Sequence, residues 1–277
     1  MRVSTNPADE RDIAEQAVAP SPDRTEQWAR AVASGVFLLA AAYTLYAARG
    51  MSGGMLMPGG WTMPMMWMVM PGQSLAGSAL LFLVMWLAMM IAMMLPSSWP
   101  TLELYSRVAR HTGQRWPMFN TVLAAAGYFT VWAAFGAIAF AAGFEISRAT
   151  MRSAQLSHWI PAVAGASLVL AGIWQLTPLK QSCLKHCREP LLFLGHAYKP
   201  GLWSGFRVGL HHGAFCAVCC WALMLMQMVL GVMNLAVMAG VAVIIATEKL
   251  WKRGPILARL VGAVSIVAGM VLVARSI

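Results

Sequence analysis

Residues 181–228 read QSCLKHCREPLLFLGHAYKPGLWSGFRVGLHHGAFCAVCCWALMLMQM, and the rest of the chain is organised around them. This stretch holds all 5 cysteines of the protein, four of its 6 histidines and a run of glycines at four-residue spacing. Residues four apart stack on one face of an α-helix. The spacing therefore predicts a helix on which small residues and then thiols share one face.

The later half of this stretch predicts a helix from Pro200 to about residue 230, because proline fits a first helical turn, where its missing N–H costs nothing. The predicted packing ridge consists of Gly201, Gly205, Gly209 and Gly213. A glycine ridge lets a second helix approach closely, which is how helices associate in lipid. Cys216 and Cys220 continue the ridge, whereas His211 points nearly the opposite way. We therefore expect the thiols to face the protein interior.

Thiolate and imidazole groups are ligands for a soft or borderline metal ion. A short helix that begins at Pro178 carries one pair of cysteines, and the glycine-ridge helix carries the other three beside a histidine. The predicted metal ligands are Cys183, Cys187, Cys216, Cys219, Cys220 and His212. Adjacent Cys219 and Cys220 do not readily bind one ion together, so the ranking begins with Cys183, Cys187 and Cys216 and places Cys220 next. The alternative is that each cysteine is a small buried apolar residue.

The composition is that of a membrane protein. Of the 277 residues, 59% are hydrophobic and only 11% are charged, and apolar runs long enough to cross a bilayer recur along the chain. We predict an all-α polytopic membrane bundle of about seven transmembrane helices. The predicted spans are residues 31–48, 74–97, 120–144, 159–175, 200–230, 235–246 and 255–273.

Charge distribution predicts how the bundle is oriented. The net charge of +10 does not indicate nucleic-acid binding, because the basic residues lie in the loops between apolar runs, and membrane lipid is the expected partner. Most lysines and arginines fall on one side, which predicts a cytoplasmic N-terminus. Residues 1–28 are then a disordered cytoplasmic tail and residues 29–277 the membrane domain. Within it, residues 50–73 form a methionine-rich outer loop, and residues 176–230 form a cysteine- and histidine-rich segment on the inner side, where thiols stay reduced.

Methionine is unusually frequent, with 22 residues, and it clusters in the outer loop and in the second predicted span. Thioethers select soft monovalent ions such as Cu(I) or Ag(I). We predict a secondary soft-metal path through Met63, Met65, Met68, Met70, Met85, Met89 and Met93. The alternatives are a loop that lies in the membrane interface and methionines that only fill the bundle core.

Four segments together resemble the predicted metal-binding integral membrane proteins of bacteria. They are MWLAMMIAMMLPS (85–97), CLKHCREP (183–190), GLHHGAFCAVCCWALM (209–224) and EKLWKR (248–253). That family is linked to a membrane copper chaperone that accompanies a bacterial tyrosinase, and the resemblance covers residues 74–253. It implies copper handling, a bacterial inner-membrane location and a cuproenzyme partner such as a tyrosinase. It does not assign the ligands.

The leading hypothesis is a Cu(I) chaperone or transfer protein, which delivers the ion to a cuproenzyme or across the inner membrane and has no catalytic residues. No Walker-type phosphate loop is present, which argues against a self-contained ATP-driven pump. One alternative is a structural zinc site. The other is a membrane redox enzyme, which usually needs histidines or carboxylates on facing helices, whereas His211 and His212 share one helix. The oligomeric state and the direction of transfer stay open.

Overall fold

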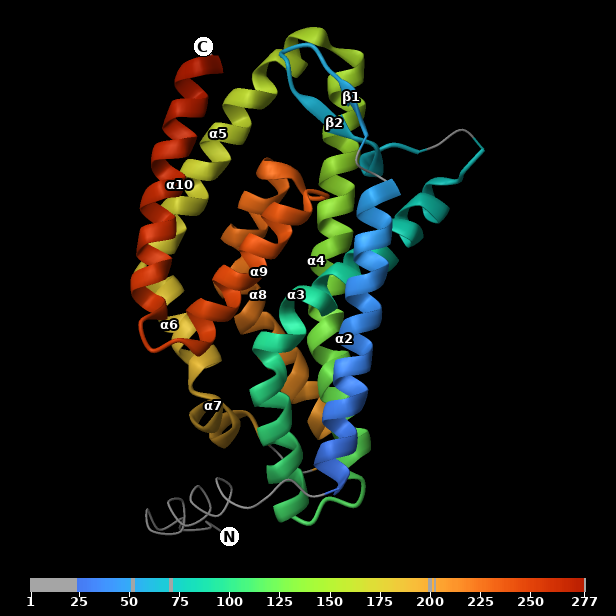
Figure 1. Ribbon diagram of the computed structural model, residues 1–277, viewed down its shortest axis with the longest axis vertical. Coiled ribbons are helices and arrows are strands. Elements are labelled where there is room, and N and C mark those ends of the chain that lie inside the picture. Colours follow the sequence, from blue (N-terminus) through green and yellow to red (C-terminus); the bar gives the residue numbers. More distant parts are fainter. Residues whose placement is uncertain (1–23, 51–52, 70–71, 199–200, 202, 277) are drawn as a thin grey trace.

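The computed structural model describes residues 24–50, 53–69, 72–198, 201 and 203–276. Figure 1 shows a bundle of helices with one small β-hairpin, which confirms the predicted all-α class. The helices are α2 (Arg24–Gly50), α3 (Leu75–His111), α4 (Pro117–Arg152), α5 (Ala154–Leu176), α6 (Pro178–Arg188), α7 (Pro190–Ala197), α8 (Ser204–Gly231), α9 (Leu235–Leu250) and α10 (Gly254–Ser276). The hairpin pairs β1 (Gly54–Leu56) with β2 (Thr62–Pro64), and the 3-10 turn η1 (Met65–Trp67) follows it.

Six helices are long and apolar enough to cross a membrane, counted over the described residues: α2, α3, α4, α5, α8 and α10. The sequence analysis predicted about seven spans. The difference is α9, which has 16 residues, whereas a span needs roughly 20. Helix α9 packs against α3, α8 and α10. A short apolar helix inside the bundle has the same sequence pattern as a span, so hydropathy alone does not separate the two.

Several helix boundaries differ from the predicted spans, and α3 and α4 continue to His111 and Arg152. Helix α2 begins at Arg24, so residues 24–28, assigned to the polar tail, are helical, while residues 1–23 lie outside the described part. Helix α8 begins at Ser204, and the predicted start at Pro200 also lies outside the described residues.

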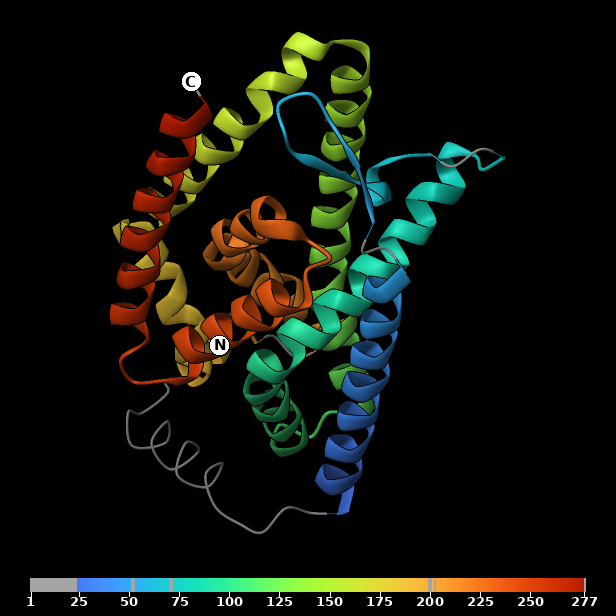
Figure 2. The ribbon, with the colours of Figure 1, turned by 45° about the horizontal axis from the view of Figure 1, so that its top comes forward.

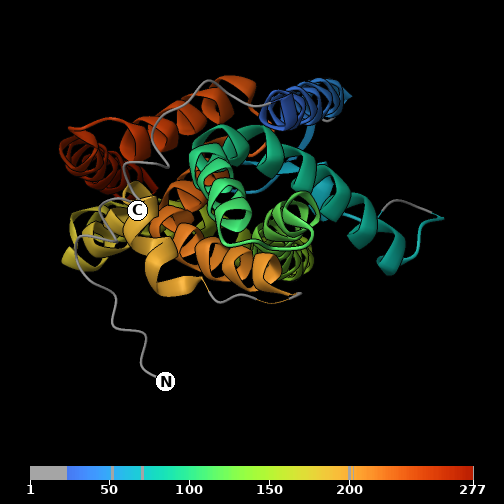
Figure 3. The same cartoon turned by 90° about the horizontal axis from the view of Figure 1, so that it is seen from below.

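Helices α3 and α8 form the centre of the bundle. Seen from below, they lie between α2 and α10 (Figure 3). Half of the most apolar stretch of each central helix is buried (50%), against 22% for α2 and for α10. The buried face of α3 carries the methionine row of the second predicted span, including Met85, Met89 and Met93. These methionines therefore face protein rather than lipid.

Helix α3 continues through Pro96 but changes direction along its length (Figure 2). Proline removes one backbone hydrogen bond and bends a helix, and Pro100 lies one turn later. Ser98 Oγ donates to the Met94 carbonyl at 2.9 Å, and such back-bonding satisfies backbone acceptors near a kink. The bend places the segment around Ser97 against the other central helices.

The glycine ridge of α8 packs against the backbone of α4. A Cβ on Gly205 would overlap the carbonyl of Asn120, and one on Gly209 would overlap that of Ala124. At Gly213 the nearest atom, the Tyr128 carbonyl oxygen, would be 2.9 Å away. The matching residues of α4 are also four apart, so two ridges of the same period meet, as close helix packing in membranes requires.

Gly201 does not belong to this ridge. It precedes α8, its φ is +152°, and a Cβ built on it would have no neighbour within 4 Å. The connection before α8 has a backbone conformation that favours glycine, and Gly201 makes no close helix contact. Its predicted packing role is therefore wrong.

Helices α5 and α10 form a second close pair that the sequence analysis missed. A Cβ on Gly172 would lie 2.6 Å from the Gly262 carbonyl oxygen, and one on Gly165 would lie 2.8 Å from that of Gly269. Ser265 Oγ of α10 also donates to the Leu168 carbonyl of α5 at 2.8 Å. On each helix the two glycines at the contact are seven residues apart, and residues seven apart also lie on one face of a helix. The pair therefore stabilises the side of the bundle opposite α2.

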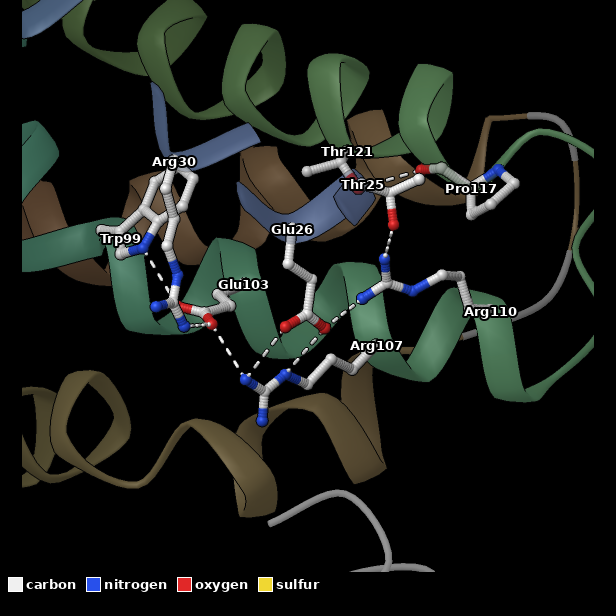
Figure 4. Close-up of polar contacts among 9 residues, drawn as sticks. All are labelled: Thr25, Glu26, Arg30, Trp99, Glu103, Arg107, Arg110, Pro117 and Thr121. Carbon is white, nitrogen blue, oxygen red and sulfur yellow. Dashed lines mark hydrogen bonds and ion pairs between the residues drawn. The ribbon is translucent and has the colours of Figure 1, made fainter. Parts of the chain in front are cut away.

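A network of ion pairs joins the start of α2 to the last turns of α3 (Figure 4). Arg107 Nη2 lies 2.9 Å from Glu103 Oε1, and Arg107 Nε lies 3.2 Å from Glu26 Oε1. Arg30 also pairs with Glu103, and Arg110 pairs with Glu26. Every charge in this network has a partner of opposite sign, so its role is to hold two helix ends together.

The two ends of the bundle differ in character. The start of α2 and the end of α3 lie at one end, with α6 and α7 in the same half of the molecule, and the β-hairpin and the end of α10 lie at the other end (Figure 1). The cysteine-rich segment and the methionine-rich loop are therefore separated along the long axis. The charge distribution predicts that the end at which α2 starts is cytoplasmic.

Candidate metal site

The structure brings four of the five cysteines together at the contact between α6 and α8. Cys187 Sγ on α6 lies 3.8 Å from Cys219 Sγ on α8, and Cys219 Sγ lies 3.3 Å from Cys220 Sγ. Cys216 lies one turn before Cys220 on the buried face of α8 and belongs to the same core. All are free and buried. We refer to Cys187, Cys216, Cys219 and Cys220 as the thiol cluster.

Cys183 lies one turn before Cys187 on α6 and is buried in the same core. No sulfur contact of Cys183 is found within the described residues, in contrast to Cys187. Burial raises the pKa of the Cys183 thiol, and the positive charge of Lys180 partly opposes this shift. The ranking placed Cys183 in its first group and gave Cys219 no place, whereas in the structure Cys219 is the cysteine that Cys187 contacts.

The sulfur of Cys216 contacts polar groups from two other helices, and one of these groups also contacts a third helix. Lys249 Nζ of α9 donates to Cys216 Sγ at 3.0 Å and to Ser97 Oγ of α3 at 3.2 Å. Tyr128 Oη of α4 lies 3.0 Å from the same sulfur. These groups are buried, which makes Cys216 the junction at which α3, α4, α8 and α9 meet.

A buried ion pair holds α6 against α9. Lys180 Nζ lies 2.7 Å from Glu248 Oε2, and both side chains are at most 1% exposed. Gln175 Nε2 donates to the other carboxylate oxygen at 3.1 Å, and Lys180 Nζ also donates to the Cys219 carbonyl at 2.6 Å. A buried pair of this kind requires partners for its remaining donors and acceptors, and here it has them. The pair fixes the short helix that presents Cys187.

His212 is buried beside the thiol cluster, and its Nε2 atom has no hydrogen-bond partner. Its ring stacks on Tyr128 with centroids 5.4 Å apart and contacts Phe193 of α7 at the same distance. A buried nitrogen without a partner is costly, and a bound ion would satisfy it. His211 points away from this site and contacts Phe193 and Phe215.

The donors are of the right kind for a soft ion, although they are not in coordinating positions as they stand. Within the described part of the chain, no group of three or more His, Cys, Asp or Glu side chains is arranged around a metal position. The Cys187–Cys219 distance of 3.8 Å is that of hydrogen-bonded thiols. Two metal–sulfur bonds of about 2.3 Å would hold the sulfurs about 3.8 Å apart at a tetrahedral angle and about 4.6 Å apart in a straight line, so an ion requires at most a small separation of the two helices.

The predicted methionines lie at the opposite end and along α3. Met63 is 1% exposed under the hairpin, and Ser147 Oγ donates to its sulfur at 3.1 Å. Met65 and Met68 line a surface cavity with Met85, the first residue of the buried α3 row. Met89 and Met93 are buried further along that row. Met70 lies outside the described residues.

Sequence reasoning missed several polar residues of the site. Lys180, Glu248 and Lys249 were not among the predicted site residues, yet Lys180 pairs with Glu248 and Lys249 contacts Cys216. A signal for Lys180 was present, because residues 180, 183 and 187 share one helix face. Tyr128 stands in the same four-residue series as Asn120 and Ala124.

An all-α membrane bundle that encloses free, buried thiols has the architecture expected of a membrane protein that handles a soft metal. The chain belongs to the copper chaperone family PpoB2, whose family model matches residues 83–272. The matched range includes the thiol cluster, Lys180, Glu248 and Lys249, and it leaves out the hairpin and α2. Comparisons with curated proteins and with solved structures found no match. Membership implies copper handling and copper binding, in agreement with the resemblance seen in the sequence.

Proposed function

We propose that this protein is a Cu(I) chaperone of the bacterial inner membrane that holds its cargo at the thiol cluster and delivers it to a cuproenzyme. The observation that carries the proposal is the buried convergence of Cys187 from α6 with Cys216, Cys219 and Cys220 from α8. Thiolates are soft ligands that favour Cu(I), zinc and iron–sulfur clusters over hard cations. Copper is the substrate here and is bound only until it is passed on.

The charges around the cluster suit a monovalent ion. Two thiolates and one Cu(I) carry a net charge of −1, and the ammonium of Lys249 beside Cys216 would balance it. Lys180 and Glu248 already neutralise each other. A buried charge needs a partner, so a divalent ion held by the same two thiolates would leave Lys249 unbalanced. This argument favours Cu(I) over the alternative of a structural zinc ion.

The short helix α6 is the element that could release the ion. It has 11 residues, lies outside the candidate spans and supplies Cys187, whereas the other cluster sulfurs belong to the central helix α8. Separation of α6 from α8 would therefore remove one ligand and leave the others in place. Its end of the bundle is the predicted cytoplasmic side, and delivery to a tyrosinase-type cuproenzyme would begin from there.

The test is the copper content of the purified protein under anaerobic, reducing conditions. We expect the thiol cluster of the wild type to retain Cu(I) against a chromogenic chelator, that of Cys216→Ser to give up its Cu(I) to the chelator, and His211→Ala to behave as the wild type. His211 is the matched control because it lies on the same helix and faces away from the cluster. Retention of zinc but not of copper by the wild type would refute the Cu(I) assignment.

Delivery is tested separately by co-expression with an apo-tyrosinase. The expected result is a copper-loaded tyrosinase with the wild-type chaperone and an apo-enzyme with Cys216→Ser at equal expression. Equal copper loading in both cultures would show that this chain does not supply that enzyme.

A further inference from the structure

The methionine-rich end of the bundle contains a cavity of about 220 Å³. Four methionines line it, Met65, Met66 and Met68 from the segment around η1 and Met85 from α3. Met65 is exposed, Met66 and Met68 are half-buried, and Met85 is 3% exposed. The thioethers therefore lead from the surface into the bundle core.

The segment that carries these methionines is held in place by its tryptophan. The Trp67 ring packs on Phe82 of α3 with centroids 5.2 Å apart, and a Cβ on Gly143 of α4 would overlap it. On the other side of the hairpin, Trp61 Nε1 donates to the Ser157 carbonyl at 3.1 Å. A binding site on an anchored segment of this kind loses little conformational entropy when its ligand binds.

We propose that this cavity is a second soft-metal site, at which thioethers bind Cu(I) or Ag(I) before the ion reaches the thiol cluster. Two polar side chains that line the cavity are bonded to each other, since Ser78 Oγ donates to Gln73 Oε1 at 3.2 Å. The sulfurs are therefore the ligands that we assign to the ion. Thioether sulfur is a neutral, soft ligand and takes monovalent rather than hard divalent ions. The inference rests on the proposed function for the identity of the cargo.

A row of residues on α3 connects the two sites. Met85 in the cavity is followed by Met89, Met93 and Ser97, each four residues further along the buried face. Ser97 Oγ accepts from Lys249 Nζ, which also contacts Cys216 Sγ. From residue 85 to residue 97 the helix rises roughly 18 Å, with a sulfur about every 6 Å as far as Met93.

The chemistry of the two ends gives this row a direction. Thioethers bind Cu(I) more weakly than thiolates and have no proton to lose, so the cavity would bind in an acidic compartment where thiols compete with protons. An ion that enters at the cavity therefore gains affinity when it reaches the thiol cluster. Midway along the row, Gln227 Nε2 of α8 donates to Met89 Sδ at 3.4 Å.

The test separates the two sites by removing one at a time. In a thiol-free variant, with Cys187, Cys216, Cys219 and Cys220 all changed to Ser, we expect about one Cu(I) per chain to remain, bound by thioethers. Its affinity should change less than about twofold between pH 7.5 and 5.5. Met66→Leu with Met68→Leu in that background should weaken binding at least about tenfold, because leucine keeps the volume and removes the sulfur.

Met151→Leu is the matched control, since this methionine lies at the same end of the bundle, is 49% exposed and does not line the cavity. Absence of copper from the thiol-free variant, with copper retained by the wild type, overturns the second site and leaves the proposed function standing. The same holds if the Met66 and Met68 changes have no effect. Absence of copper from both proteins removes both proposals.

A second measurement does not depend on the folding of the thiol-free variant. In the wild-type background, Met66→Leu with Met68→Leu should slow the loading of the thiol cluster from limiting Cu(I) at least about fivefold and leave final occupancy unchanged. Unchanged loading kinetics in this variant would contradict a role for the cavity ahead of the thiol cluster.

Discussion

Lys249 Nζ of α9 lies 3.0 Å from Cys216 Sγ of α8, and the same ammonium donates to Ser97 Oγ of α3. A cation and a thiol in direct, buried contact are a costly arrangement unless the thiol, or an ion bound to it, carries the balancing charge. This contact ties the bend of α3, the end of α9 and the centre of α8 to the predicted cargo site. It provides the first prediction.

Replacement of Lys249 by Met should lower Cu(I) affinity roughly tenfold to a hundredfold, because the bound ion and two thiolates lose their balancing charge. The measurement is Cu(I) competition with a chelator of known affinity. Lys252→Met is the control, since Lys252 is exposed and lies just beyond the same helix. Equal losses in the two variants would show that the effect is one of overall charge, whereas no loss in Lys249→Met would disprove the charge-balancing role.

The ion pair between Lys180 and Glu248 should behave as one unit. Lys180→Met or Glu248→Gln alone leaves a buried charge without its partner, which is expected to cost about 3–5 kcal/mol of stability. The double variant should recover most of that loss, because neither charge remains. Thermal unfolding in detergent measures the cycle. Additive losses in the double variant would mean that the two side chains stabilise the bundle independently.

The contact between α4 and α8 has no room for a side chain at Gly209. Gly209→Leu should prevent assembly of a monodisperse protein, because the new side chain would overlap the Ala124 carbonyl and separate the two helices. Gly240→Leu on α9 is the control, since no atom lies within 4 Å of its Cβ position. Size-exclusion profiles of the two variants should differ, and a normal profile for Gly209→Leu would contradict close packing of these helices.

Orientation in the membrane can be tested with single introduced cysteines, because the native thiols are buried. Leu56→Cys, on the exposed hairpin, should react in intact cells with a thiol reagent that does not cross the inner membrane. Lys252→Cys, on the exposed turn before α10, should react only after the cells are permeabilised. The reverse labelling pattern would invert the predicted topology.

The close helix contacts show which helix packing can be predicted from sequence periodicity. The α8 ridge was predicted from glycines four apart, and the structure places Gly205, Gly209 and Gly213 against α4 as that spacing requires. The α5–α10 contact was missed, because its glycines are seven apart and only two on each helix lie at the contact. Gly201 had the right spacing and lies outside the helix. Spacing indicates a shared face only where the chain is helical, and it does not identify the partner.

By itself, the sequence determined the all-α membrane bundle and the segment that carries the thiols, because long apolar runs and i, i+4 spacing are local properties of the chain. Only the tertiary structure decided that Cys187 meets Cys219, that Lys180 pairs with Glu248, and that Lys249 reaches Cys216. Each of these contacts joins residues at least 32 positions apart. Their pairing depends on how α6, α8 and α9 pack, and no local pattern encodes that packing.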